Sequence, residues 1–144
     1  MTAALFAPLF FTMALLLAHG YFLMGSVPLL ILKYDVPMDA RFVRGLYNIY
    51  YRAAGFIAVA TAVSYGYAGR PVFAAGAAAL AILALILCRI VLPKMDSLRG
   101  QIQASDRAAI AAFRRIHVVS ILVNLAQLTL IVWALIDFSL QLKQ

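Results

Sequence analysis

Residues 113–128 read FRRIHVVSILVNLAQL, and the rest of the chain is organised around this stretch. Two arginines stand before an apolar run that begins at a histidine. Four polar side chains lie along this stretch at spacings of three, four and three residues: His117, Ser120, Asn124 and Gln127. Residues three or four apart share one face of an α-helix. The spacing therefore predicts an apolar helix with these four residues, the polar ladder, along one side.

The composition of the chain is that of a membrane protein. Of its 144 residues, 66% are hydrophobic and 12% are charged, and the mean hydropathy is +0.99. Soluble domains are closer to half apolar and a quarter charged. The net charge of +7 comes from cations at the ends of apolar runs, as bilayer topology requires, so no nucleic-acid partner is expected.

Four apolar runs are long enough to cross a bilayer, for which about 20 residues suffice. They predict an all-α, integral membrane four-helix bundle that forms one domain over residues 1–144, with spans at about 6–32, 43–68, 71–92 and 113–136. An amphipathic, membrane-skimming helical connection is expected at about 94–112, interrupted near Gly100 or Ser105. Either Ser105 or Asp106 is expected to cap the last helix.

Local signals predict the other helix ends. Asp39 is the expected N-cap of the second helix, and Pro71 suits the first position of the third. Pro93 is expected to end the third helix. The second span opens with aromatics among arginines, a composition typical of an interfacial belt: Phe42, Tyr47, Tyr50 and Tyr51.

The distribution of lysine and arginine predicts the orientation. Ten of the 12 lie in or beside two connections: Lys33, Arg41, Arg44, Arg52, Arg89, Lys94, Arg99, Arg107, Arg114 and Arg115. Only Arg70 and Lys143 lie on the other side. The positive-inside rule then places both connections in the cytoplasm and both termini on the non-cytoplasmic side. The alanine-rich composition favours a multi-pass protein of a bacterial inner membrane.

Two histidines are the candidate catalytic residues, because ionisable groups inside a span need a partner or a function. His19 lies near the middle of the first span. It is either bonded to a neighbouring helix, for example to Asn124 or Gln127, or it serves as a metal or haem ligand, a proton carrier or a ligand contact. His117 lies about 15 Å from the midplane at 1.5 Å per residue, which disfavours a haem held by both histidines.

The sequence therefore predicts no metal site and no cofactor, with haem or quinone as the remaining alternative. No carboxylate lies deep in a span, and the one cysteine, Cys88, is interpreted as a packing residue.

The polar ladder has two interpretations. Interhelical hydrogen bonds, each worth roughly 0.6–2 kcal/mol, explain Ser120, Asn124 and Gln127 without any ligand. Alternatively, these residues line a cleft with a cationic mouth that binds an anionic headgroup or an amphipathic aromatic molecule. The candidate ligand-binding residues are then Arg52, Arg114, Arg115 and His19 together with His117, Ser120, Asn124 and Gln127.

The pattern Phe-x-Arg-x-His-x-x-Ser-x-x-x-Asn-Leu resembles the family of small membrane proteins that includes transmembrane protein 205. Its matching positions are Phe113, Arg115, His117, Ser120, Asn124 and Leu125. Weaker similarities lie in LYNIYYRAAG and at Leu92-Pro93. The resemblance implies a four-helix domain of largely unassigned function. A weaker resemblance is to the anthrone-oxygenase-like membrane proteins, which implies four spans and oxygenation without a cofactor.

Three functional hypotheses follow. The first is a non-enzymatic bundle whose polar ladder faces the first span and forms a shallow cytoplasmic-side cleft for a lipid headgroup or an amphipathic small molecule. The second is an oxygenase-like enzyme for an aromatic substrate, with His117 or His19 as base and Asn124 and Gln127 orienting substrate oxygens. The third is an accessory subunit of a larger membrane complex, near haem or quinone. Membrane lipids and a homo-oligomer or larger complex are the expected partners.

Overall fold

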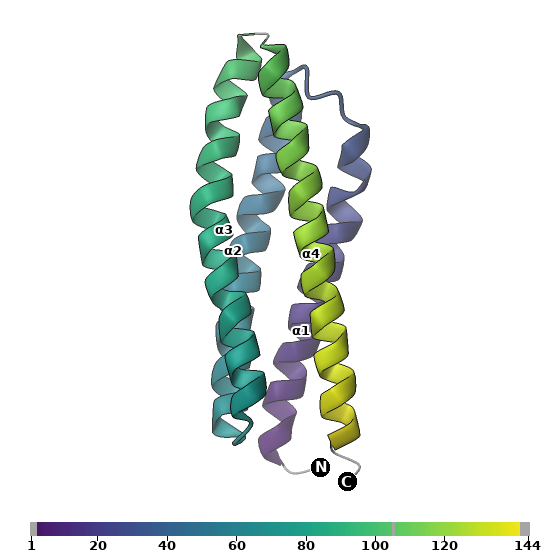
Figure 1. Cartoon of the computed structure of the whole chain (residues 1–144), viewed down its shortest axis with the longest axis vertical. Helices are drawn as coiled ribbons and strands as arrows, with labels where there is room; N and C mark the ends of the chain where they lie inside the picture. Colours follow the sequence, from purple (N-terminus) through teal and green to yellow (C-terminus); the bar gives the residue numbers. More distant parts are fainter. Residues whose placement is uncertain (1–2, 105, 142–144) are drawn as a thin grey trace.

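The computed structural model describes residues 3–104 and 106–141, and this part of the chain is all-helical. Its elements are α1 (Ala3–Ser26), the 3₁₀-helix η1 (Pro28–Ile31), α2 (Pro37–Tyr67), α3 (Pro71–Gln103) and α4 (Arg107–Gln141). Neighbouring helices run in opposite directions along one long axis (Figure 1). The α1–α2 connection and the α3–α4 turn lie at the same end of the bundle, which we call the connection end. The α2–α3 turn, the start of α1 and the end of α4 lie at the opposite end, which we call the terminal end.

Three segments are long and apolar enough to cross a membrane: Leu5–Ile31, Pro71–Gln103 and Arg107–Gln141. Large apolar side chains lie exposed on the outer surface of the bundle, including Met24, Ile90 and Leu122. Contiguous apolar surface of this kind is unfavourable in water and favourable in lipid. The all-α class and the membrane-protein composition predicted from the sequence are thus consistent with the structure.

The prediction that Pro93 ends the third helix is wrong. α3 continues through Pro93 to Gln103, with the proline ring exposed on its outer side. Proline removes one backbone donor, but Met95, Leu98 and Ile102 beyond it are buried in the core, and this burial favours continuation.

Residues 94–103 therefore extend α3 along the bundle and do not form a separate helix, and Gly100 lies within α3. α3 ends at Gln103, and α4 begins at Arg107. The Asp106 carboxylate accepts the backbone N–H of Ala108 at 2.8 Å, which confirms Asp106 as a cap of α4. The alternative cap, Ser105, lies outside the described residues.

The predicted N-cap at Asp39 is also wrong. α2 starts at Pro37 after Val36, because proline presets the helical φ angle and needs no N–H acceptor. Asp39 instead lies in the first helical turn, and its carboxylate accepts the backbone N–H of Tyr34 at 3.2 Å. This bond helps to hold Tyr34 in a left-handed conformation, with φ of 59°, which non-glycine residues rarely adopt.

The turn at the terminal end follows the sequence prediction. Pro71 is the first residue of α3, and Gly69 adopts φ of 68°. The N–H of Arg70 bonds to the Tyr65 carbonyl at 2.9 Å, and that of Gly69 bonds to the Gly66 carbonyl at 3.1 Å. These two bonds form a Schellman motif, which satisfies the last carbonyls of α2.

The interfacial belt predicted at the start of α2 is wrong for the tyrosines. Tyr47, Tyr50 and Tyr51 are at most 7% exposed, whereas Phe42 is 66% exposed. The tyrosines share a helical face with Ala54 and Ala58, which are also buried. This face of α2 packs into a core at the connection end that includes Phe22, Tyr34, Tyr47, Met95 and Phe113. A smaller core nearer the terminal end contains Leu15, Ala58 and Ile131.

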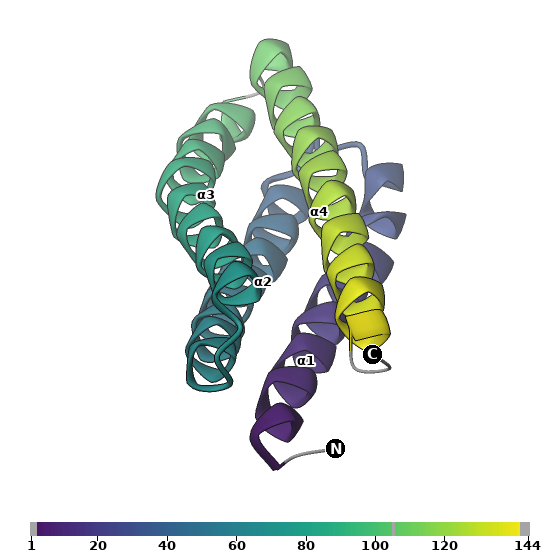
Figure 2. The same ribbon diagram turned by 60° about the horizontal axis from the view of Figure 1, so that its bottom comes forward.

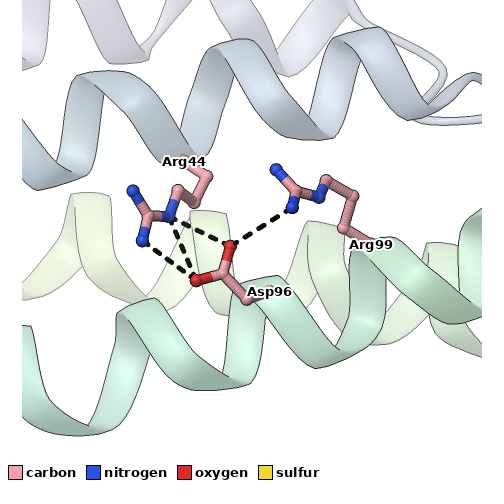
Figure 3. A network of polar contacts seen from close by, with 3 residues as sticks. All are labelled: Arg44, Asp96 and Arg99. Atoms are coloured by element: carbon pink, nitrogen blue, oxygen red, sulfur yellow. Dashed lines mark hydrogen bonds and ion pairs between the residues drawn. The ribbon is translucent and has the colours of Figure 1, made fainter.

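An ion pair joins α2 to α3 near the connection end (Figure 3). The Arg44 Nε and Nη2 atoms donate to the two Asp96 carboxylate oxygens at 3.0 and 2.9 Å, and the Arg99 Nη2 atom lies 3.9 Å from the same carboxylate. The side chains of Arg44 and Asp96 are 31% and 38% exposed, so the pair is worth at most about 1 kcal/mol. Its bidentate geometry fixes the register of the two helices.

Candidate functional site

All four side chains of the polar ladder point into the bundle, as their spacing predicts. His117, Ser120, Asn124 and Gln127 are all buried, whereas Val119 and Leu122 on the same helix are exposed. Three of the four belong to two hydrogen-bonded clusters, His117 to one at the connection end and Asn124 and Gln127 to one around Tyr50 in the middle of the bundle.

The His117 cluster joins α4 to α1, α2 and the connection between them. The Ser26 hydroxyl lies 2.8 Å from Nε2 of His117, and the Tyr34 hydroxyl is hydrogen-bonded to Nδ1. The same Tyr34 hydroxyl donates to the Leu29 carbonyl at 2.9 Å. The Tyr47 hydroxyl donates to the backbone carbonyl of His117 at 3.1 Å. His117 therefore has partners at both ring nitrogens and is 0% exposed.

The hydrogen bonds of Tyr34 define the tautomer of His117. A phenol has one proton, and a carbonyl oxygen can only accept, so the Tyr34 proton points to Leu29. Nδ1 of His117 must then donate to the Tyr34 oxygen, and in the neutral ring Nε2 accepts from Ser26. This arrangement satisfies every polar atom of the cluster with a neutral imidazole.

The surroundings of Tyr34 favour the neutral phenol, which donates its proton to the Leu29 carbonyl. It lies in the connection before α2, and burial raises the pKa of its phenol above the ordinary value of 10.0, against a lowering by Arg114. The Arg114 guanidinium lies 5.6 Å from the centre of the Tyr34 ring and donates to the Leu32 carbonyl at 2.9 Å. Arg114 thus fastens the end of η1 to α4, a structural role that explains its position.

The second cluster is centred on Tyr50 of α2. The Asn124 amide donates to the Tyr50 hydroxyl at 2.6 Å, and this hydroxyl lies 3.4 Å from Oε1 of Gln127, to which it donates. Within the described part of the chain, the buried Oδ1 atom of Asn124 has no hydrogen-bond partner. Such an orphan acceptor costs about 1–3 kcal/mol unless water or a ligand reaches it.

His19 belongs to this second cluster. Nδ1 of its ring donates to the Leu15 carbonyl of its own helix at 2.9 Å, and the ring meets the Tyr50 ring edge-on at 5.5 Å between centroids. His19, Tyr50 and Gln127 also line an internal cavity of about 10 Å³, room for about one water molecule. The main partner of His19 is thus its own helix.

The structure does not bring the remaining candidates into one site. Arg52 and Arg115 are exposed, and Arg114 is engaged with backbone carbonyls. His19 and His117 lie in separate clusters. Among residues 3–104 and 106–141, no three His, Cys, Asp or Glu side chains gather as a metal site would require.

Four residues of these clusters were missed by sequence reasoning: Ser26, Tyr34, Tyr47 and Tyr50. The two tyrosines of α2 could have been found, because Tyr47, Tyr50, Ala54 and Ala58 follow the spacing of a buried helical face. Ser26 and Tyr34 have no comparable local signal, since only the packing of α1 and its connection against α4 brings them to His117.

A large groove opens in the half of the bundle near the terminal end. Its volume is about 690 Å³, and α3 and α4, which lie apart there in both views, supply most of its walls (Figure 2). The walls are mainly apolar and include Leu15, Ala77, Leu80, Ile131 and Trp133. Polar groups lie at its two ends, with Gln127 toward the middle of the bundle and Arg70, Asp137 and Gln141 at the terminal end. Of the polar ladder, only Gln127 reaches this groove.

Comparisons with family models, with curated proteins and with solved structures each found no match. The resemblance to the transmembrane protein 205 family therefore stays a prediction from the sequence.

The deduced tautomer of His117 can be measured. Nitrogen-15 NMR of the protein labelled at histidine should show Nδ1 of His117 carrying the proton and Nε2 as an unprotonated acceptor at neutral pH. Replacing Tyr34 with Phe removes the acceptor of the Nδ1 proton and should shift the His117 signals, whereas Tyr21→Phe, at an exposed position of α1, should leave them unchanged. A proton on Nε2 in the unaltered protein would contradict the assignment.

Proposed function

We propose that this protein is a non-enzymatic, four-span membrane bundle that binds a single-chain amphipathic lipid in the groove near its terminal end. The observation that carries the proposal is the groove itself. Its volume of about 690 Å³ lies within the usual range of about 300–1,000 Å³ for ligand sites, and its apolar walls end in polar groups on both sides.

The packing of α2 supports a fourth span. α2 is less apolar than the other helices because its first half carries Asp39, Arg41, Arg44 and Arg52, and because tyrosines and small residues form its interior face. Its outer face carries Ile49, Phe56, Val59 and Val63, all more than half exposed. Such a face is unfavourable in water and favourable in lipid, so average hydropathy understates the ability of α2 to cross the membrane.

The charge distribution supports the orientation. The ends of the helices at the α1–α2 and α3–α4 connections carry most of the cations, and the α2–α3 turn carries Arg70. The positive-inside rule then places the connection end in the cytoplasm and the terminal end outside, in a bacterial inner membrane. The groove opens toward the non-cytoplasmic leaflet in this orientation.

The polar groups at the ends of the groove, and not its apolar walls, determine which ligand it prefers over bulk lipid. Moving an alkyl chain from the bilayer into an apolar groove gains little, because lipid tails are as apolar as the groove walls. Gln127 and Gln141 are 14 residues apart on α4, about 21 Å at 1.5 Å per residue, which matches an extended acyl chain. The groups at the terminal end then recognise the head of the ligand. Arg70 is positioned there by a 3.1 Å bond to Gln141 and by the Phe138 ring, 5.7 Å away.

The enzyme hypothesis requires a base that reaches a substrate. His117 is fully buried with both ring nitrogens engaged, and Nδ1 of His19 is bonded to the backbone. His117 would have to exchange a partner before it could accept a substrate proton, and the cavity that His19 lines has a volume of only about 10 Å³, so the geometry favours binding over catalysis. The accessory-subunit hypothesis stays a prediction from the sequence.

Filling the groove tests ligand binding. A Cβ atom at Gly76, which lines the groove, would meet no atom within 4 Å, so the side chain of Gly76→Phe starts in open space, and thermal unfolding checks the fold of the variant. Native mass spectrometry from mild detergent should show a retained lipid on the unaltered protein and loss of most of it in Gly76→Phe. Ala75→Phe, one residue away and outside the groove lining, is the matched control and should retain the lipid. Equal retention by both variants would refute the groove as the binding site.

Cysteine labelling tests the orientation and the fourth span. With Cys88 replaced by Ala, single cysteines are placed at Asp35, two residues before α2, and at Tyr67, the last residue of α2, and both positions are exposed. In intact cells, a membrane-impermeant maleimide should label Tyr67→Cys and should label Asp35→Cys only after permeabilisation. Labelling of both positions from the same side would show that α2 does not cross the membrane, and the reverse pattern would show an inverted protein.

A further inference from the structure

A second hollow, separate from the groove, lies at the connection end between the start of α2 and the last turns of α3. Its volume is about 430 Å³, and its lining residues are Pro37, Met38, Arg41, Arg99 and Gln103. Two arginines that are 58 positions apart in the sequence thus face the same hollow, and none of its lining residues is acidic. We propose that the Arg41–Arg99 hollow is a binding site for a phosphate group.

The guanidinium group of Arg99 is not hydrogen-bonded to Asp96, the carboxylate closest to it. Asp96 accepts three hydrogen bonds from Arg44, the shortest at 2.9 Å, whereas its closest approach to Arg99 is 3.9 Å, beyond hydrogen-bond distance (Figure 3). Arg99 is therefore held near the hollow while its donors remain open. Within the described residues, Arg41 forms no ion pair, and it is exposed.

The remaining lining groups add donors of the same kind. Pro37 and Met38 are the first two residues of the 31-residue helix α2, so the N–H of Met38 lies beside the hollow, while the Asp39 carboxylate of the same turn accepts the N–H of Tyr34. The Gln103 side chain contributes an amide donor from the last turn of α3. Guanidinium groups match the oxygens of a phosphate in geometry and charge, which favours this anion over a chloride ion.

The position of the hollow admits two sources of phosphate. If the hydrocarbon boundary on α3 lies at Leu92, Arg99 is seven residues beyond it, about 10 Å along the helix. The headgroup layer is about 5–8 Å thick, so the Arg99 backbone lies a few ångströms outside it, within reach of the layer for a long side chain. Either the headgroup of an anionic phospholipid or a phosphate of a soluble molecule could reach the hollow, and the chemistry of recognition is the same.

The test compares two double variants with equal loss of charge. Arg41→Gln with Arg99→Gln removes both guanidinium groups from the hollow, and Arg107→Gln with Arg115→Gln removes two exposed cations of α4 at the same end. Glutamine keeps the helix propensity, and thermal unfolding in phosphate-free buffer checks the fold of each variant. One arm measures the binding of inorganic phosphate in detergent, against chloride at matched ionic strength. The other measures phosphatidylglycerol retained by native mass spectrometry after extraction from vesicles of phosphatidylcholine and phosphatidylglycerol.

In at least one arm, the Arg41 and Arg99 variant should lose affinity by about tenfold or more, while the control pair stays near the unaltered protein. A loss confined to the inorganic phosphate arm identifies a soluble ligand, and a loss confined to phosphatidylglycerol identifies a headgroup. Equal behaviour of the two double variants in both arms, or no binding by the unaltered protein in either, would overturn the proposal. This test does not depend on the lipid groove, because Gly76→Phe leaves the hollow unchanged.

Discussion

Hydrocarbon offers no hydrogen-bond partners, and in the membrane location that we propose this constraint accounts for the centre of the bundle. A helix that carries His117, Ser120, Asn124 and Gln127 through lipid must turn these groups inward and meet them with polar groups from its neighbours. The structure does so with hydroxyl groups. Ser26 and Tyr34 bond to His117, and Tyr50 bonds to both Asn124 and Gln127. The tyrosines suit this position because their rings fill the core while their hydroxyls reach the ladder.

The two halves of the bundle differ because these partners are unevenly distributed. Toward the connection end, the aromatic core, the ladder and the Arg44–Asp96 pair close the interior. Toward the terminal end, the ladder has ended, α3 is rich in alanine, and α4 stands away from it. Small side chains and diverging helices leave the apolar groove, with Gln127 at the point where the closed half meets the open half. Asn124, whose Oδ1 atom has no partner in the described part of the chain, lies three residues before Gln127, and Gln127 also lines the cavity beside His19.

The sequence predicts the elements better than it predicts the site. Helical periodicity gives the inward side of α4, and local chemistry gives the turn before Pro71 and the cap at Asp106. Prediction from the sequence fails at Pro93, where burial of the following residues outweighs a local helix-breaking signal. It also fails at the tyrosines of α2, because tyrosines among arginines are typical of an interfacial belt and these tyrosines are buried. The partnership of Tyr34 with His117 depends on a left-handed residue in a connection, and the groove depends on helix spacing, neither of which a local pattern encodes.

A double-mutant cycle on Tyr50 and Asn124 tests the central claim, that α4 is fixed in the bundle by hydrogen bonds from its inward polar face to α2. The measurement is the free energy of unfolding in detergent for Tyr50→Phe, Asn124→Ala and the double variant. The two single effects should be non-additive by about 0.6–2 kcal/mol, whereas Tyr50→Phe combined with Leu125→Ala, on the exposed face of α4, should be additive. Additivity of Tyr50→Phe and Asn124→Ala within about 0.3 kcal/mol would show that the two residues do not interact, and would contradict this account of the fold.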